Sequence, residues 1–319
     1  MTVLIRRPYL GKTDLKAITE LVNSCETVGQ LDKDTSIAHL PLQLDEPSFD
    51  KARDLRLWED DTGTLMGFGQ ISMPEAKEAI DGYLYFYVHP KAHEDRLETD
   101  IIRWSERRML EVTKERRLPA KLRSSSRDDI TDRIAVLEQH QFKVDRHFLT
   151  MTCRLDRAIP APQLSAGFTL RPLGGDRDME AWVECFNDSF IDHWNHHDLT
   201  VATLKHWLSD PHYRADLNLI TLAPDGKLAA FCYAGISPEE NSESGRNEGW
   251  IHWLGTGPSF RKLGLGRALL LAAMHQLKAA GVGTVKLAVD ADSMTGARRL
   301  YDSVGFEPVQ TWLSYVKPV

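Results

Sequence analysis

The chain contains an internal repeat, and this repeat constrains the fold more than any other feature of the sequence. Arg7-Pro8 closes a β-like run near the start, and Arg171-Pro172 closes a similar run 164 residues later. At the same offset, the helical stretch TDLKAITELVNS matches RDMEAWVECFND and pairs Asp14 with Asp178. Three more matches follow in the same order: GTLMGF with GKLAAF, VHPK with TGPS, and HQFKV with VGFEP. A series of this kind predicts two copies of one fold.

Each copy alternates strand-like and helix-like stretches: strand, helix, helix, strand–turn–strand, strand, helix, strand, helix and a final strand pair. This order is typical of an α/β domain with a central sheet of mixed direction. The stretch RAIPAPQLSAG (157–167) interrupts the periodicity with two prolines, a serine and a glycine. We therefore expect two domains, 1–156 and 166–319, in agreement with a length of 319 residues.

The composition narrows the class of protein. An apolar fraction of 42% with 27% charged residues is typical of a globular protein, and no apolar run approaches the length of a membrane span. A net charge of −7 and a pI near 6.0 argue against a nucleic-acid partner. The N-terminus lacks the apolar core of a signal peptide, so a cytoplasmic location is expected. The four cysteines are scattered, which favours reduced thiols over disulfides or a zinc knuckle.

The most informative stretch is residues 249–281, in which a strand-like run turns at Gly257-Pro258 and enters a helix that stops at Gly281. The loop between strand and helix reads RKLGLGR (261–267). Glycines allow successive backbone N–H groups to converge on one point, and a helix N-terminus adds partial positive charge. Such a loop suits a pyrophosphate. It is neither a nucleotide P-loop nor a Rossmann fingerprint, and by itself it could also be a tight turn before a surface helix.

The segment LGTGPSFRKLGLGRALL resembles the acetyl-CoA signature R-x-x-G-x-G of the GNAT superfamily of N-acetyltransferases. The later segment VDADSMTGARRLYDSVGF (289–306) resembles that family's second signature, which ends in L-Y-x-x-x-G-F. Together the two motifs cover most of the second copy. The tandem arrangement resembles that of the mycothiol synthase family. That likeness concerns architecture and leaves the substrate open.

The resemblance implies acetyl-CoA as co-substrate and assigns several roles. The strand carrying Leu254, Gly255 and Thr256 would splay from its neighbour and bind the pantetheine arm through its backbone. Tyr301 would lie beside the thioester sulfur. Ser293 stands where relatives commonly carry an asparagine that touches the cofactor. The pyrophosphate would be held by the loop residues Arg261, Lys262, Leu263, Gly264, Leu265, Gly266 and Arg267.

The first copy departs from these signatures. Aligning Pro90 with Pro258 places Arg96 and Glu98 where the two loop glycines stand in the second copy. Aligning Phe142 with Phe306 places Leu137 at the Tyr301 position. The loop glycines and the phenol are therefore missing together. We expect the first domain to bind no acyl-CoA and to serve in packing or in shaping the acceptor cleft.

Acyl transfer to an amine requires a neutral nucleophile. An alkyl ammonium has a pKa near 10.4, so losing its proton at pH 7 costs roughly 4–5 kcal/mol. His252 is the candidate base, because strand alternation would place it on the same face as Thr256. The alternative interpretation makes His252 a core residue between Trp250 and Trp253. Glu248 is a second candidate base, acting through a water.

The leaving thiolate must gain a proton, and Tyr301 is the candidate general acid. A phenol is a weaker acid than a thiol by roughly 1.5 pKa units, a gap of about 2 kcal/mol. The alternative makes Tyr301 an aromatic packing residue at a helix end.

The acceptor side is expected near FNDSFIDHWNHHD (186–198), with Trp312 and Tyr315 of the last strand within reach. No paired cysteine or carboxylate accompanies these histidines, so no metal is expected. The sequence thus predicts an acyl-CoA-dependent N-acyltransferase acting on a small-molecule or peptide amine, as a monomer or homodimer. The alternative is a non-catalytic acyl-CoA-binding module of the same fold. Such a module would bind CoA without turnover.

Overall fold

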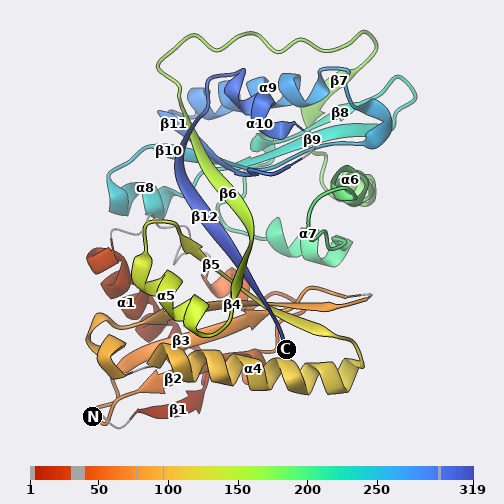
Figure 1. Ribbon diagram of the computed structural model, residues 1–319. Coiled ribbons are helices and arrows are strands. Elements are labelled where there is room, and N and C mark those ends of the chain that lie inside the picture. The colour runs from red at the N-terminus through yellow and green to blue at the C-terminus, as the bar shows by residue number, and fades with distance from the viewer. Residues whose placement is uncertain (1–3, 30–39, 77, 96, 294–295) are drawn as a thin grey trace. The chain divides into compact units, whose positions relative to one another are not determined.

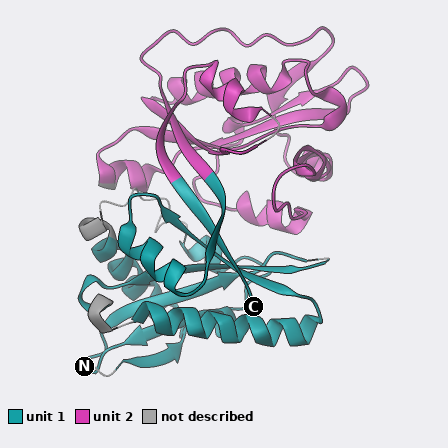
Figure 2. Ribbon diagram, viewed as in Figure 1, with its two compact units in different colours: residues 1–147, 312–319 teal, residues 148–311 magenta. Residues whose placement is uncertain are grey.

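The computed structural model describes residues 4–29, 40–76, 78–95, 97–293 and 296–319. It divides into two compact units, residues 1–147 with 312–319 and residues 148–311 (Figure 2). Each unit has a mixed sheet with helices on both faces (Figure 1), as the repeat predicts. Arg96 of the first copy, which the sequence analysis aligned with a loop glycine, lies outside the described residues.

The elements of the first copy, in chain order, are β1 (Ile5–Pro8), α1 (Lys12–Gly29), α2 (Leu40–Leu44), α3 (Lys51–Asp54), β2 (Leu55–Glu59), β3 (Leu65–Ser72), β4 (Ile80–Val88), the 3₁₀ helix Pro90–Asp95, α4 (Leu97–Arg116), β5 (Ala120–Arg127), α5 (Thr131–Gln139) and β6 (Lys143–Arg154). One long strand, β6, stands where a final strand pair was expected.

The second copy repeats this order of strands, with one further helix, α8, between its third and fourth strands. Its elements are β7 (Thr169–Pro172), α6 (Asp176–Phe190), α7 (Val201–Trp207), the 3₁₀ helix Ala215–Leu217, β8 (Asn218–Leu222), β9 (Leu228–Gly235), α8 (Pro238–Ser244), β10 (Glu248–Thr256), the 3₁₀ helix Pro258–Phe260, α9 (Leu265–Ala279), β11 (Thr284–Asp290), α10 (Ala297–Asp302) and β12 (Glu307–Pro318).

The repeat extends to individual hydrogen bonds. In the first copy the guanidinium of Arg7 donates to both carboxylate oxygens of Asp14, at 2.9 and 2.8 Å, and to the Pro8 carbonyl. In the second copy Arg171 donates to both oxygens of Asp178, at 2.6 and 2.9 Å, and to the Pro172 carbonyl. This bidentate pair ties the first strand of each copy to its first helix. The arginine and the aspartate that match between the two copies therefore form the same contact in each copy.

The last strands are exchanged between the copies. In unit 2, residues 148–154 of β6 pair antiparallel with the whole of β11, and Met151 is fully buried in the core below α9. In unit 1, β12 pairs antiparallel with β5, and Tyr315 is fully buried in the core below α4. The units therefore differ from the expected domains 1–156 and 166–319 at both ends. The sequence copies end at their own last strands, whereas each folded core is completed by the last strand of the other copy.

Unit 2 positions the candidate site between two helical layers. Its strands run in the order β7-β8-β9-β10-β11, completed by residues 148–154 of β6. α9 packs on one face of this sheet, and α6 with α7 packs on the other (Figure 1). Nine residues of α9 are buried, and Gly281 ends the helix in the left-handed conformation with φ +89°, as predicted.

The described residues contain no helix with both the length and the apolar character needed to cross a bilayer.

Candidate active site

The two central parallel strands of unit 2 part midway along their length. β10 and β11 are in register from Glu248/Thr284 to Ile251/Leu287, and β10 then continues to Thr256 while β11 continues to Asp290. Over that second stretch β11 still pairs with β6, and β10 still pairs with β9. The structure thus has the fork that was expected beside Leu254, Gly255 and Thr256.

Each strand residue at the fork faces a definite layer. Leu254 packs against the core under α9, whereas Gly255 faces α6. A Cβ on Gly255 would lie 2.4 Å from the Phe231 ring and 3.0 Å from Ser189, so only glycine fits there. Thr256 points back toward the start of α9, because a Cβ on Gly266 would lie 3.4 Å from its Oγ1. The end of β10 and the N-terminus of α9 therefore adjoin each other.

The loop before α9 forms an open helix N-terminus. Gly264 occupies the N-cap position with φ +77°, and no described side chain caps the first turn. A Cβ on Gly264 would meet open space, so the conformation and not crowding requires glycine there. Lys262 is also left-handed, at φ +65°, and is exposed. Uncapped N–H groups with the helix dipole behind them make an anion site.

The flanking loop residues hold this turn in place. Arg261 donates to Asp192 Oδ2 at 2.8 Å and to the Ser189 carbonyl at 3.1 Å, at the end of α6. Arg267 donates to Ser303 Oγ at 2.5 Å, after α10. The Leu263 carbonyl accepts from Ser165 at 2.8 Å, while Leu265 is buried in the core. Both arginines are thus hydrogen-bonded to residues outside the loop. Lys262 makes no ion pair within the described part of the chain.

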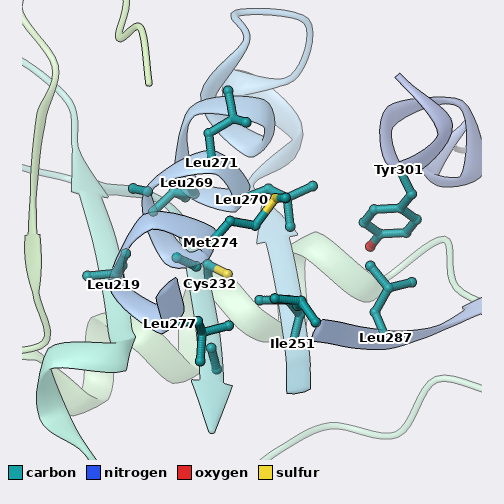
Figure 3. Close-up of a cluster of buried hydrophobic side chains, with 14 of the residues drawn as sticks. Leu219, Cys232, Ile251, Leu269, Leu270, Leu271, Met274, Leu277, Leu287 and Tyr301 are labelled. Atoms are coloured by element: carbon teal, nitrogen blue, oxygen red, sulfur yellow. The ribbon is translucent and has the colours of Figure 1, made fainter. Parts of the chain in front are cut away.

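Tyr301 lies at the branch point of the fork. It is buried in the same core cluster as Ile251 and Leu287, the last residues in register between β10 and β11. Figure 3 shows its hydroxyl directed toward Leu287. Burial, with a smaller effect of Cys232, raises the pKa of Tyr301 above its ordinary value, and burial raises that of Cys232 to about 12. The phenol is therefore protonated throughout the neutral range.

His252 lies on the opposite face from the one predicted. A β-bulge between Ile251 and Trp253 makes His252 the extra residue of β10. Its ring lies 5.2 Å from that of Tyr233, and a Cβ on Gly235 would lie 2.6 Å from its Nε2. The alternation argument was wrong, because a bulge adds one residue and reverses the faces beyond it. The core interpretation was also wrong, since His252 is exposed.

The other candidate residues are distributed as follows. Glu248 lies in the paired part of β10 and forms an ion pair with Lys286 at 2.8 Å. Ser293 follows β11, and its N–H donates to the Asp290 carbonyl at 3.2 Å. Tyr315 is fully buried in the core of unit 1, so it does not line an acceptor cleft of unit 2.

The predicted acceptor segment leads out of α6 into a histidine-rich turn. The Nδ1 atom of His193 lies 2.9 Å from the Trp194 carbonyl, and His196 Nε2 lies 3.2 Å from Asp198 Oδ1. Among the described residues, no group of three or more His, Cys, Asp or Glu side chains could hold a metal ion.

Sequence reasoning named Trp253 but missed the aromatic residues of β9 and α7 that pack near it. Trp253 stacks on Trp207 of α7 with a centroid distance of 5.9 Å and an interplanar angle of 3°. Both rings are half-buried and belong to the cluster that also contains Tyr233. No local motif marks these residues, because β10, β9 and α7 meet only in the folded unit.

Unit 1 has the same fork, but a side chain bridges it. β4 and β5 are in register only from Ile80/Ala120 to Tyr83/Arg123. The guanidinium of Arg133 donates to the Phe86 carbonyl of β4 at 3.1 Å and to the Ser125 carbonyl of β5 at 2.8 Å. It also stacks 4.1 Å from the centroid of the Phe86 ring.

The alignment of Phe142 with Phe306 pairs Arg133 with Ala297, so the second copy has only a methyl group at this position. The bridge is therefore specific to the first copy. Leu137 is fully buried, as suits an aliphatic residue at the Tyr301 position. The side chains of Glu94 and Asp95, which precede α4, are outside the described set.

Comparison with known proteins agrees with this geometry. Residues 179–306 match the acetyltransferase (GNAT) family. Unit 2 carries a GNAT acetyltransferase domain. The matched range contains the fork, the loop and Tyr301 of this GNAT domain.

Curated relatives include two mycothiol acetyltransferases. The protein from Thermomonospora curvata is 31% identical over 168 residues, which cover 51% of this chain and 52% of the relative. That from Thermobispora bispora is 35% identical over 153 residues, which cover 48% of this chain and 50% of the relative. The chain thus spans about half the length of the curated relatives it matches.

Solved structures resemble the whole chain. A GCN5-related N-acetyltransferase from Sphaerobacter thermophilus has a TM-score of 0.75 at 22% identity, covering 99% of this chain and 95% of that protein. A tandem GNAT protein from the clavulanic acid biosynthesis pathway has a TM-score of 0.72 at 13% identity, covering 99% and 98%. At these identities the likeness shows the fold, and it confirms the predicted tandem arrangement.

Proposed function

We propose that the GNAT domain transfers an acetyl group from acetyl-CoA to a primary amine of a small molecule or peptide. The observation that carries the proposal is the fork between β10 and β11, which ends beside the uncapped N-terminus of α9. The anionic pyrophosphate of acetyl-CoA would suit that helix N-terminus. Its extended pantetheine arm would suit the part of β10 that has separated from β11. The names of the curated relatives support acetyl transfer.

Acetyl-CoA would be held by groups from both sides of the fork. The N–H groups at Gly264, Leu265 and Gly266, with the Lys262 amine, would hold the pyrophosphate. The backbone of residues 254–256 would bind the pantetheine arm, and Ser293 would lie at the far side. Arg261 and Arg267 would hold the loop in position through their hydrogen bonds to the end of α6 and to Ser303. Their positive charges would also favour an anion nearby.

In the reaction, the amine nitrogen attacks the thioester carbonyl, the C–N bond forms and the C–S bond breaks. Tyr301 would donate its phenolic proton to the leaving thiolate. Burial makes the phenol a weaker acid, but the same burial raises the proton affinity of the thiolate. His252 would accept the proton of the amine. Since His252 lies against Tyr233, which belongs to the cluster packed under α6 and α7, the acceptor would approach on the side of those helices.

The first test combines calorimetry with turnover. Acetyl-CoA titrated into the intact protein should bind once per chain. Adding a panel of polyamines, aminoglycoside-like amines and peptides should then release free CoA thiol with at least one of them. Binding without turnover would instead support a non-catalytic acyl-CoA-binding module, and the absence of binding would exclude both.

Replacing His252 with glutamine should lower kcat by about a hundredfold, which is the lower end of the range typical for loss of a general base. His275→Gln on α9 is the matched control, with its ring bonded to the Pro160 carbonyl. A kcat for His252→Gln equal to that of His275→Gln would remove His252 from the mechanism.

We infer that unit 1 holds no acyl-CoA, because Arg133 already bonds the backbone of both strands at its fork. Arg133→Ala should lower the free energy of unfolding by about 2–3 kcal/mol, because the carbonyls of Phe86 and Ser125 would lose a charged hydrogen-bond donor. Chemical unfolding of this variant and of Arg103→Ala, an exposed arginine on α4, measures the difference. Two acetyl-CoA molecules bound per wild-type chain would contradict the inference.

A further inference from the structure

Unit 1 contains a hollow lined by five arginines. Its volume is about 160 Å³, several times the space that one ordered water needs. Trp104 and Glu111 of α4 complete the lining. The lining arginines, which come from β1, α3, β2 and α4, are Arg6, Arg53, Arg56, Arg107 and Arg108. Such a concentration of positive charge contrasts with the net charge of −7 for the chain.

The strand register explains why these side chains converge. Arg6 of β1 lies opposite Trp58 of β2, and Pro8 lies opposite Arg56, so Arg6 and Arg56 share a face. That face is covered by α4, because Trp58 packs edge-on against Trp104 at 5.8 Å. Gly69 of β3 allows the close approach, since a Cβ there would lie 3.2 Å from the Trp104 ring.

Two of the five guanidinium groups are paired with carboxylates. Arg108 donates to Asp54 at 2.7 Å and to Glu111 at 3.2 Å. Arg53 pairs with Glu115 and lies 3.7 Å from Glu111. Three carboxylates pair with two of the five lining arginines, and Glu111 alone of the three lines the hollow, so its lining carries a net positive charge.

The other three arginines have no carboxylate partner in the described part of the chain. Arg56 donates only to the carbonyls of Ala52 and Leu55, at 2.6 and 2.7 Å. Arg6 and Arg107 are exposed and form no ion pair with a described residue. Burial lowers the pKa of Arg56, as do the nearby charges of Arg6 and Arg108, whereas Glu111 and Asp54 act in the opposite direction. Like charges held close together in this way repel each other, and an anion bound between them would offset that repulsion.

The geometry points to a second anion site, distinct from the α9 loop, that binds the phosphoryl group of a small phosphorylated molecule. Guanidinium groups match phosphate oxygens with paired hydrogen bonds and lose hydration easily, so arginines are suited to this ligand. Arg6, Arg56 and Arg107 would supply the donors, and the Trp104 ring would form an apolar wall.

Inorganic phosphate is the probe, titrated calorimetrically into the full chain at constant ionic strength. The Gly264→Glu variant serves as background, because it removes the α9 loop as a competing anion site. Arg6→Gln and Arg107→Gln should each weaken phosphate binding by at least about tenfold. Both residues are exposed and form no ion pair with a residue that the structure describes, so neither change is expected to disturb the fold. Arg103→Gln removes the same charge from α4 outside the hollow and should change the affinity by less than about twofold.

Three outcomes would overturn the proposal: no saturable binding of phosphate in this background, equal weakening by Arg103→Gln and Arg107→Gln, or binding that occurs only on lipid. The last is measured by sedimentation with vesicles containing phosphatidic acid, against vesicles of phosphatidylcholine alone. The proposal does not depend on the acetyltransferase activity, since Arg6 and Arg107 lie in unit 1 and the readout is phosphate binding.

Discussion

Replacing Gly264 with glutamate should weaken acetyl-CoA binding by at least about a hundredfold. The new carboxylate would stand at the uncapped start of α9, where a pyrophosphate is proposed to bind. Two like charges about 4 Å apart repel by about 4 kcal/mol at the effective dielectric of a protein surface. The positive φ of +77° adds backbone strain of about 1–2 kcal/mol, which lowers stability without bearing on the ligand.

Gly281→Glu is the matched control for this change. Gly281 ends the same helix, has φ +89° and, like Gly264, has no neighbour within 4 Å of an added Cβ. Both variants therefore introduce the same charge and a similar strain at opposite ends of α9. Calorimetry should show lost binding for Gly264→Glu alone, whereas Tm should fall at least as much in Gly281→Glu, because the helix dipole stabilises a carboxylate at the N-terminus and not at the C-terminus. Equal affinities in the two variants would mean that the loop does not hold the pyrophosphate.

Replacing Tyr301 with phenylalanine should lower kcat by about a hundredfold to ten-thousandfold, with little change in KM for acetyl-CoA. The hydroxyl is the only group removed, and it is proposed to protonate the leaving thiolate. Because burial raises the pKa of Tyr301, its ionisation should not limit the wild-type rate below about pH 10. Steady-state kinetics over a range of pH measure both effects.

Tyr315→Phe removes the same atom from another buried tyrosine and serves as the control. Tyr315 is fully buried in unit 1, and its hydroxyl has no hydrogen-bond partner among the described residues. Removing an unsatisfied buried hydroxyl should leave kcat unchanged and keep or slightly raise stability. A Tyr301→Phe variant as active as Tyr315→Phe would show that Tyr301 only packs.

The raised pKa of Tyr301 also affects stability at alkaline pH. The unfolded chain ionises this phenol near pH 10, whereas the folded chain keeps it protonated to higher pH. Its contribution to stability is therefore complete below about pH 10 and is lost as the pH rises further. Tyr301→Phe should make the free energy of unfolding fall less steeply above that pH than in the wild type.

The repeat, the mixed fold and the end of α9 at Gly281 could be predicted from the sequence alone, because each is carried by short stretches of sequence. Arg7 and Asp14 are seven residues apart, and their contact recurs between Arg171 and Asp178. Gly264 and Gly281 mark the ends of α9 by their own backbone conformation. Spacing and residue type carry such information directly.

Only the tertiary structure decided the features that join distant segments. The bulge at His252 results from pairing β10 with β9, and it moved the candidate base to the face of α6 and α7. Arg133 closes the fork of unit 1 through contacts with β4 and β5, which a comparison of loop glycines does not reveal. The exchange of β6 and β12 leaves no local signal, because it pairs β6 with β11 and β12 with β5, strands that lie far apart in the sequence.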